Sequence, residues 1–131
     1  FMKVLKPIRL FILCLLFSSM TYGQEIVSNI PSAIKLANAS VLAKNFDKRV
    51  DITINESADN YSREQGEIII KNFLNKFSSR DFSVVHKGNS PDGSQYLIGS
   101  FKTNAGNFRT YFYIKKSDTG NFIQEIRFEK E

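Results

Sequence analysis

Cysteine and histidine are almost absent from this chain, which has one of each in 131 residues. Cys14 lies in a segment that we expect to be removed, so the mature chain would hold no disulfide, no thiol nucleophile and no thiolate ligand. A zinc site takes three or four protein ligands, and His86 has no second histidine to join it. We therefore predict no metal site and no cofactor.

A long apolar run is also missing. The longest, Leu10–Phe17, has eight residues, whereas a membrane span needs about 20. It follows three cations, Lys3, Lys6 and Arg9, and precedes the polar and small residues Ser18–Gly23. This is the pattern of a secretory signal peptide, with the cut after Gly23. We expect a periplasmic or secreted protein with no membrane span in its mature form; a retained membrane anchor is the alternative.

The chain has little excess of charge of either sign once the predicted signal peptide is excluded. Residues 24–131 carry 15 basic and 13 acidic side chains, a net charge of +2, because all three cations of residues 1–23 are lost. Nucleic-acid binding proteins usually present a strongly basic face, so we expect no nucleic-acid partner. The remaining 108 residues are enough to form one domain that is stable without disulfide bonds.

Catalytic motifs are missing as well. The sequence has no glycine-rich phosphate loop, no serine nucleophile elbow and no paired-carboxylate motif. We therefore predict no catalytic residue from motifs.

Four strands joined by short turns dominate the second half of the chain. Alternating apolar and polar residues predict strands at Phe82–Lys87, Gln95–Phe101, Phe108–Ile114 and Phe122–Phe128. Short connections, such as the one holding Pro91-Asp92-Gly93, join antiparallel neighbours. These strands should form an antiparallel meander.

The first half of the mature chain should supply helices to cover that sheet. Apolar residues at helical spacing predict a helix within residues 24–38, and Pro31 places its regular start near Ser28 or Ile30. Ser40 can cap a second short helix, Val41–Asn45.

A strand and a longer helix complete the plan. Arg49–Ile54 alternates strictly, with Asp51 on the face opposite Val50, so it should be a half-buried strand. The polar residues Asn55–Asn60 follow as a predicted loop. Ser62 and Gln65 then form a capping box that opens a helix running to Phe77.

This order of elements predicts an α+β fold: a curved antiparallel sheet of about five strands wrapped around two to three N-terminal helices in a cone. The opening helix, the Phe46–Ile52 segment, the Ser62–Phe77 helix and the meander resemble the nuclear transport factor 2-like (cystatin-like) superfamily. Several short motifs are similar to a family of small secreted bacterial proteins catalogued as a domain of unknown function. These motifs are Tyr61-Ser62, Val84–Gly88, Asp92–Tyr96 and Gln124–Phe128.

The last hairpin has two predicted faces. Phe108, Phe112, Phe122 and Phe128 should meet the helices, with Gln124 as a polar residue among them. The opposite face should be open and able to bind a partner, because tyrosine and arginine dominate interface hot spots. Its predicted interaction residues are Arg109, Tyr111, Tyr113, Ile123, Glu125 and Arg127. An ordinary solvated sheet face is the alternative.

A pocket inside the cone is the other candidate site. Some enzymes of the superfamily isomerise or dehydrate small apolar molecules inside the cone, using an inward Asp or His with a Tyr. The resemblance therefore implies a candidate pocket of this kind here. The polar candidates are His86, Tyr96 and Gln124, with His86 expected on the face of Phe82 and Val84. Asp51 should point away from that pocket.

These observations favour a non-catalytic binding or protein-interaction module of the cell envelope. We expect the partner to be a second copy of the chain, held through the open sheet face, or another envelope protein; a small apolar ligand stays open. The alternative function is a small-molecule isomerase or dehydratase with its pocket in the cone.

The signal-peptide pattern makes a direct prediction. The mature amino terminus should lie within about two residues of Gln24. Intact-mass measurement of the protein from its native cells checks this, and a full-length species in the membrane fraction would contradict it.

Overall fold

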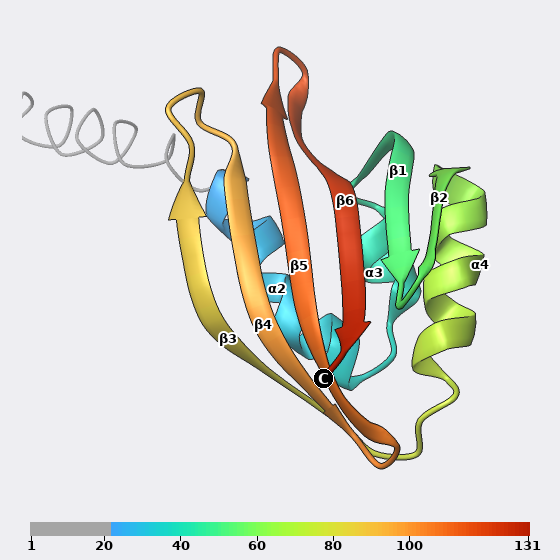
Figure 1. The fold of residues 1–131 in the computed structure, drawn as a ribbon. Helices are drawn as coiled ribbons and strands as arrows, with labels where there is room; N and C mark the ends of the chain where they lie inside the picture. The colour runs from blue at the N-terminus through green and yellow to red at the C-terminus, as the bar shows by residue number, and fades with distance from the viewer. Residues whose placement is uncertain (1–21) are drawn as a thin grey trace, which may run out of the picture.

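The structure is a computed structural model that describes residues 22–131, with side chains from residue 26 onward. The predicted signal peptide therefore lies outside the described residues, except for its last two positions. The described chain forms helices α2 (Tyr22–Lys35), α3 (Ala39–Ala43) and α4 (Arg63–Leu74) and strands β1 (Phe46–Ile54), β2 (Ser57–Ser62), β3 (Arg80–Asn89), β4 (Gln95–Thr103), β5 (Gly106–Ser117) and β6 (Gly120–Lys130). The helices cover one side of a curved sheet (Figure 1).

The sheet confirms the predicted α+β fold class and differs from the prediction in two details. It has six strands in the order β2-β1-β6-β5-β4-β3, one more than expected. The meander β3–β6 is antiparallel throughout, whereas β1 lies parallel to β6. The parallel pair arises because α4 and the meander separate β1 from β6 in the chain, which leaves ample length for a crossover.

The additional strand is β2, in the segment predicted to be a polar loop; that prediction is wrong. Asn55, in the left-handed region at φ 54°, opens a tight turn between β1 and β2. Because β2 is an edge strand, it can be polar on both faces and shows no apolar alternation. Side chains help to hold it: Arg49 Nε donates to Asn60 Oδ1 at 2.6 Å, and Asn60 Nδ2 donates to Asp51 Oδ1 at 2.7 Å.

The helix boundaries also differ from the predictions. The helix α2 begins at Tyr22, so Pro31 lies inside it rather than in its first turn. One lost hydrogen bond at proline is tolerated because the helix buries Ile26, Ile30 and Ile34 on one stripe. The short helix α3 is capped by Asn38 instead of Ser40, since Asn38 Oδ1 accepts from the Val41 amide at 3.4 Å.

The helix α4 begins as predicted, with both hydrogen bonds of the Ser62–Gln65 capping box present. It ends at Leu74, before the predicted Phe77, although Phe77 is still buried. Gly66 lets the helix approach β1 closely: a Cβ atom there would lie 2.8 Å from Val50 Cγ1. A larger residue at this position would push α4 off the sheet.

Arg80 ties the ends of two helices to the start of β3. Its Nε donates to the carbonyl of Lys35, the last residue of α2, at 3.1 Å. Its Nη1 donates to the carbonyl of Leu74, the last residue of α4, at 3.4 Å. It also donates to the carbonyl of Phe77, three residues beyond the helix, at 2.6 Å. The last carbonyls of a helix have no partners within it and carry partial negative charge, so one guanidinium satisfies groups from both helices.

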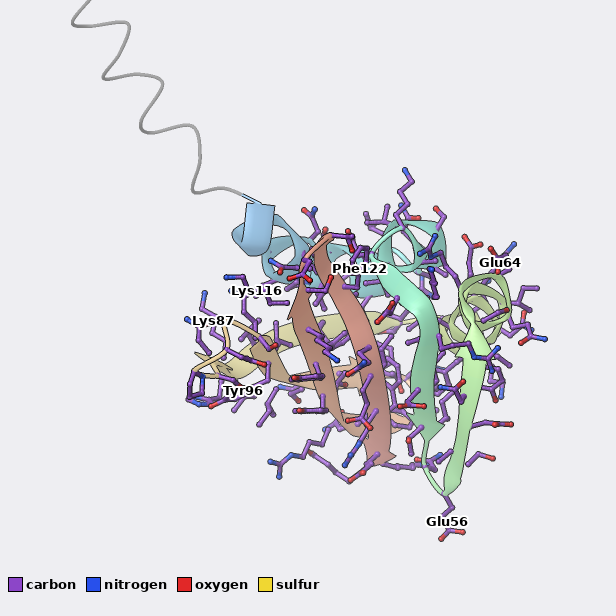
Figure 2. All side chains as sticks on the ribbon, turned by 90° about the horizontal axis from the view of Figure 1, so that it is seen from above. Glu56, Glu64, Lys87, Tyr96, Lys116 and Phe122 are labelled. Atoms are coloured by element: carbon purple, nitrogen blue, oxygen red, sulfur yellow. The ribbon has the colours of Figure 1, made fainter. Side chains whose placement is uncertain are left out.

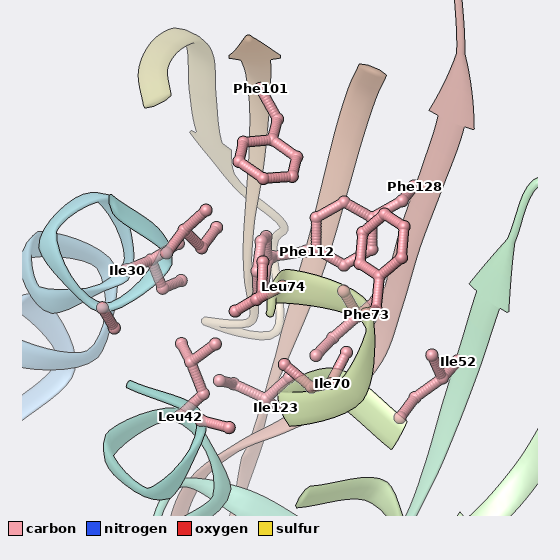
Figure 3. Close-up of a cluster of buried hydrophobic side chains, with 14 of the residues drawn as sticks. Ile30, Leu42, Ile52, Ile70, Phe73, Leu74, Phe101, Phe112, Ile123 and Phe128 are labelled. Atoms are coloured by element: carbon pink, nitrogen blue, oxygen red, sulfur yellow. The ribbon is translucent and has the colours of Figure 1, made fainter. Parts of the chain in front are cut away.

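The core is an aromatic cluster between α4 and the sheet (Figure 3). The Phe73 ring lies 4.7 Å from that of Phe128, 5.4 Å from that of Phe108 and 5.3 Å from that of Phe77, centroid to centroid. Phe101 joins them from β4. The inner face predicted for β5 is confirmed, since Phe108, Thr110, Phe112 and Ile114 are all buried.

Truncating either side of this layer should destabilise the protein strongly. Phe73→Ala and Phe112→Ala should each lower the free energy of unfolding by about 3–5 kcal/mol, because a large cavity is left. Urea denaturation of the mature protein measures this. Leu36→Ala, at a side chain that is 73% exposed, is the control and should change stability by less than about 0.5 kcal/mol. Midpoints at the wild-type value for both Phe variants would contradict the helix-on-sheet core.

Candidate functional site

The sheet face turned away from the helices carries a tyrosine cluster. Cross-strand register places Tyr96 opposite Tyr113 and Ile98 opposite Tyr111. Their neighbours along the strands, such as Leu97 and Phe112, are fully buried on the inner face. The tyrosines are half-buried by packing beside one another. We call this surface the outer tyrosine face; it comprises Tyr96, Ile98, Arg109, Tyr111, Tyr113, Glu125, Arg127 and Glu129.

Arg127 on β6 is the electrostatic centre of this face. Its Nη2 donates to both carboxylate oxygens of Glu125, each at 3.2 Å. Its guanidinium carbon lies 5.5 Å from the centre of the Tyr111 ring, within range of a cation–π contact. Register pairs Arg127 with Tyr111 and Glu125 with Tyr113 across β5 and β6. Glu125 and Tyr111 together hold the Arg127 guanidinium over the Tyr111 ring.

Burial raises the pKa of the Tyr111 phenol, and the Glu125 carboxylate adds to this effect. Both causes disfavour the phenolate, whereas the Arg127 cation opposes them. Tyr111 is therefore a neutral hydrogen-bond donor and acceptor at physiological pH. This is the form suited to a contact surface rather than to proton abstraction.

A shallow depression of about 250 Å³ lies in the middle of the outer tyrosine face. Its lining residues are Ile98, Arg109, Tyr111, Arg127 and Glu129. Apolar, aromatic and charged groups of both signs meet here within a small area. Ile98 was not among the residues predicted for the interaction face, although its alternation with the buried Leu97 indicates its outward position.

Two residues near the start of β6, Ile123 and Gln124, lie differently from their predicted positions. Ile123 is fully buried in the core (Figure 3) and does not belong to the interaction face. Gln124 is half-buried and is not a buried polar residue of the inner face. The reason is a bulge: Tyr113 pairs with Glu125 whereas Ile114 pairs with Ile123, so Gln124 is an extra residue and the alternation shifts by one. The other predicted face residues, Arg109, Tyr111, Tyr113, Glu125 and Arg127, do lie together.

His86 is likewise shifted by a bulge. Val84 pairs with Gly99 whereas His86 pairs with Ile98, so Val85 is the extra residue. The prediction that His86 shares the face of Phe82 and Val84 is wrong for that reason. Instead it is exposed beside Tyr96, with its Nε2 atom 3.1 Å from the Tyr96 hydroxyl.

The interior of the cone does not bring the enzyme candidates together. Among the side chains described, the buried polar residues are Ser94 and Thr110, neither of which ionises near neutral pH. Asp51 points away from the core as predicted and accepts a hydrogen bond from Asn60. It lies on β1, and three strands, β6, β5 and β4, separate it from His86 on β3. The predicted pocket residues therefore do not converge in the cone.

Within residues 22–131, no group of three or more His, Cys, Asp or Glu side chains is arranged to hold a metal ion. The described helices also include none that is long and apolar enough to cross a membrane.

Comparison with known proteins identifies relatives of the whole described fold. The model of the family described as "Domain of unknown function (DUF4783)" matches residues 27–129. A member of that family from Bacteroides uniformis is 27% identical, with a TM-score of 0.73 over 79% of this chain and 95% of that one. Curated proteins give no match.

More distant structures share the fold alone. A domain of unknown function with a cystatin-like fold from Nostoc punctiforme is 11% identical, with a TM-score of 0.68 over 87% of this chain and 80% of that one. An NTF-2 like protein of unknown function from Silicibacter pomeroyi is 9% identical, with a TM-score of 0.62 over 86% of this chain and 95% of that one. The expected nuclear transport factor 2-like, cystatin-like fold is confirmed.

The Tyr111 environment predicts a pH dependence of stability. Since the folded-state pKa lies above the unfolded value of 10.0, the stability that this phenol contributes is fully present below pH 10 and is lost as the pH rises through the folded-state pKa. Urea midpoints at pH 8 and pH 10.5 should therefore differ less in Tyr111→Phe than in the wild type. An equal difference in the two proteins would contradict the burial of this phenol.

Proposed function

The chain belongs to the DUF4783 family of domains of unknown function, and we propose that it is an exported, non-catalytic binding module that docks through its outer tyrosine face. The observation that carries this proposal is a group of three tyrosines and Ile98 at the centre of a sheet face that no described helix covers. Around this centre lie the charged residues Arg109, Glu125, Arg127 and Glu129.

The composition of this face is that of an interface rather than of an active site. Interface hot spots are enriched in tyrosine and arginine, and a ring of polar groups shields them from water. Arg127 is already oriented by Glu125 and Tyr111, so docking would cost little side-chain entropy there. A partner that covers the face would also desolvate this ion pair in a prearranged geometry.

The charge pattern favours a second copy of the chain as the partner. Charges of both signs alternate along β6 as Glu125, Arg127 and Glu129, and Arg109 lies opposite Glu129 on β5. The two positive and two negative charges of this face cancel, so it does not attract a nucleic acid or an anionic membrane. A two-fold contact would set the same mixed pattern against itself, which permits opposite charges to meet in an isologous interface.

Export is part of the proposal. The basic residues before Leu10–Phe17 and the small residues ending at Gly23 support removal of residues 1–23 and a site of action in the cell envelope. A mature chain without cysteine is insensitive to the redox state of that compartment.

Removing the tyrosines tests the docking face. Tyr111→Ser with Tyr113→Ser should abolish self-association while lowering the free energy of unfolding by only about 1–2 kcal/mol, because both side chains are half-buried on the outer face. Sedimentation equilibrium of the mature protein, together with urea denaturation, measures both quantities.

Leu36→Ser with Ile68→Ser is the matched control. It removes two exposed apolar side chains, 73% and 56% accessible, from the turn after α2 and from α4, both away from the outer tyrosine face. This variant should dimerise like the wild type. A wild-type protein that stays monomeric at every concentration, or a tyrosine variant that dimerises normally, would refute docking of a second copy through this face.

A further inference from the structure

A groove runs between α2 and the free edge of the sheet. The strand β3 ends the sheet order and pairs only with β4 among the described strands. At one end α2 is fastened to β3, where Lys35 Nζ lies 3.7 Å from Asp81 Oδ1 and Arg80 bonds the Lys35 carbonyl. Towards the other end a cavity of about 660 Å³ opens between Val27 and Pro31 of α2 and the end of β3.

The edge of β3 itself belongs to this groove. Lys87, Gly88 and Asn89 are consecutive residues of the strand, and all three line the cavity. Alternate residues of a strand point to opposite faces, so a cavity that touches three in a row includes the strand's edge. The outward main-chain groups of an edge strand are unpaired and can accept another strand.

The side chains of the groove define which strand would fit. Val27, Pro31 and Val84 supply an apolar wall, and Lys87 is the one charged residue among the described side chains of the lining. Gln95, which also lines the groove, has its Oε1 atom buried with no hydrogen-bond partner. A buried acceptor without a donor is costly and uncommon in native proteins. It would be satisfied by an N–H group brought by a ligand.

We propose that this groove binds an extended peptide segment of a partner protein, added to β3 as a short strand. The peptide carries a carboxylate, which pairs with Lys87, and an apolar side chain, which lies against Val27 and Pro31. Its main chain pairs with the free edge of β3, and a side-chain N–H group of the peptide reaches past Asn89 to donate to Gln95 on the neighbouring strand β4. Strand addition beside a helix is an established mode of peptide recognition.

A short peptide fits better than the same edge of a second copy. The bulge at Val85 divides the edge into two short regular stretches, and the groove opens beside the one from Lys87 onward. Two copies joined edge to edge around this stretch would bring their Lys87 side chains together, and facing like charges are destabilising. In Figure 2, Lys87 and Lys116 lie at the end of the molecule away from Glu64, which also favours an acidic ligand.

A phage-displayed library of random heptapeptides, panned against the mature protein, tests the proposal. We expect enrichment of peptides with an acidic residue two positions from an apolar one, since alternate side chains share a face. A synthetic copy of the best peptide should bind Lys87→Glu at least about tenfold more weakly and should bind Lys71→Glu, the control on exposed α4 surface, like wild type. Failure to enrich acidic peptides, or unchanged binding to Lys87→Glu, would overturn the proposal.

Two further measurements separate strand addition from binding by side chains alone. Methylation of the peptide's main-chain nitrogens, one at a time, should abolish binding at alternate positions, because only every second N–H faces β3. Gln95→Leu should raise the melting temperature of the free protein by about 4 °C, because it removes the unpartnered buried oxygen. The same change should weaken binding of the peptide. Full binding by every methylated peptide would refute strand addition, and full binding by Gln95→Leu would refute the role of Gln95.

The single variant Tyr111→Ser keeps this test independent of the dimer proposal. Tyr111 pairs with Ile98 and does not line the groove, whereas Tyr113 pairs with Tyr96, which does. Tyr111→Ser should therefore bind the selected peptide with wild-type affinity. Loss of peptide binding in this variant would show that the peptides had been selected by the outer tyrosine face, and the groove proposal would fail.

Discussion

The close approach of α4 to the sheet is the constraint on which the rest of the structure depends. Gly66 leaves no side chain between the helix and β1. Phe73 can therefore pack against the rings of Phe77 after α4, Phe108 on β5 and Phe128 on β6. Because α4 occupies the inner side, the sheet can face water or a partner only on its other side. The position of the outer tyrosine face is thus a consequence of helix packing, and Arg80 holds that packing at the far end of the helix.

Much of the fold could be predicted from local chemistry. Strict alternation identified β1 and the four strands of the meander, and the capping box identified the start of α4. The inner face of β5 and the outward position of five of the six candidate interaction residues followed from the same alternation, because a regular strand sends every second residue to one side. These signals are strong where burial is one-sided and the strand is unbroken.

The rest could not be predicted because its causes lie outside the local pattern. A bulge adds one residue without a distinctive sequence, so Ile123 and His86 were each assigned to the opposite face. The strand β2 is polar on both sides and is specified by its partner β1 and by the Arg49–Asn60–Asp51 hydrogen bonds. The groove beside β3 depends on where α2 leaves the sheet, and that position involves contacts distant in sequence, such as the hydrogen bond from Arg80 to the Lys35 carbonyl.

The central place of β6 in the sheet sets the order in which the chain can complete its fold. The hairpin β1–β2 and the strands β3–β5 are joined in the described sheet only through β6, which follows all of these strands in the chain. A ribosome therefore makes β6 after β1–β5, and the two halves of the sheet stay unconnected until β6 has been synthesised. Pairing β1 with β6 also closes a loop of some 70 residues, and such distant contacts slow folding. The sheet of the nascent chain consequently remains open until β6 is available.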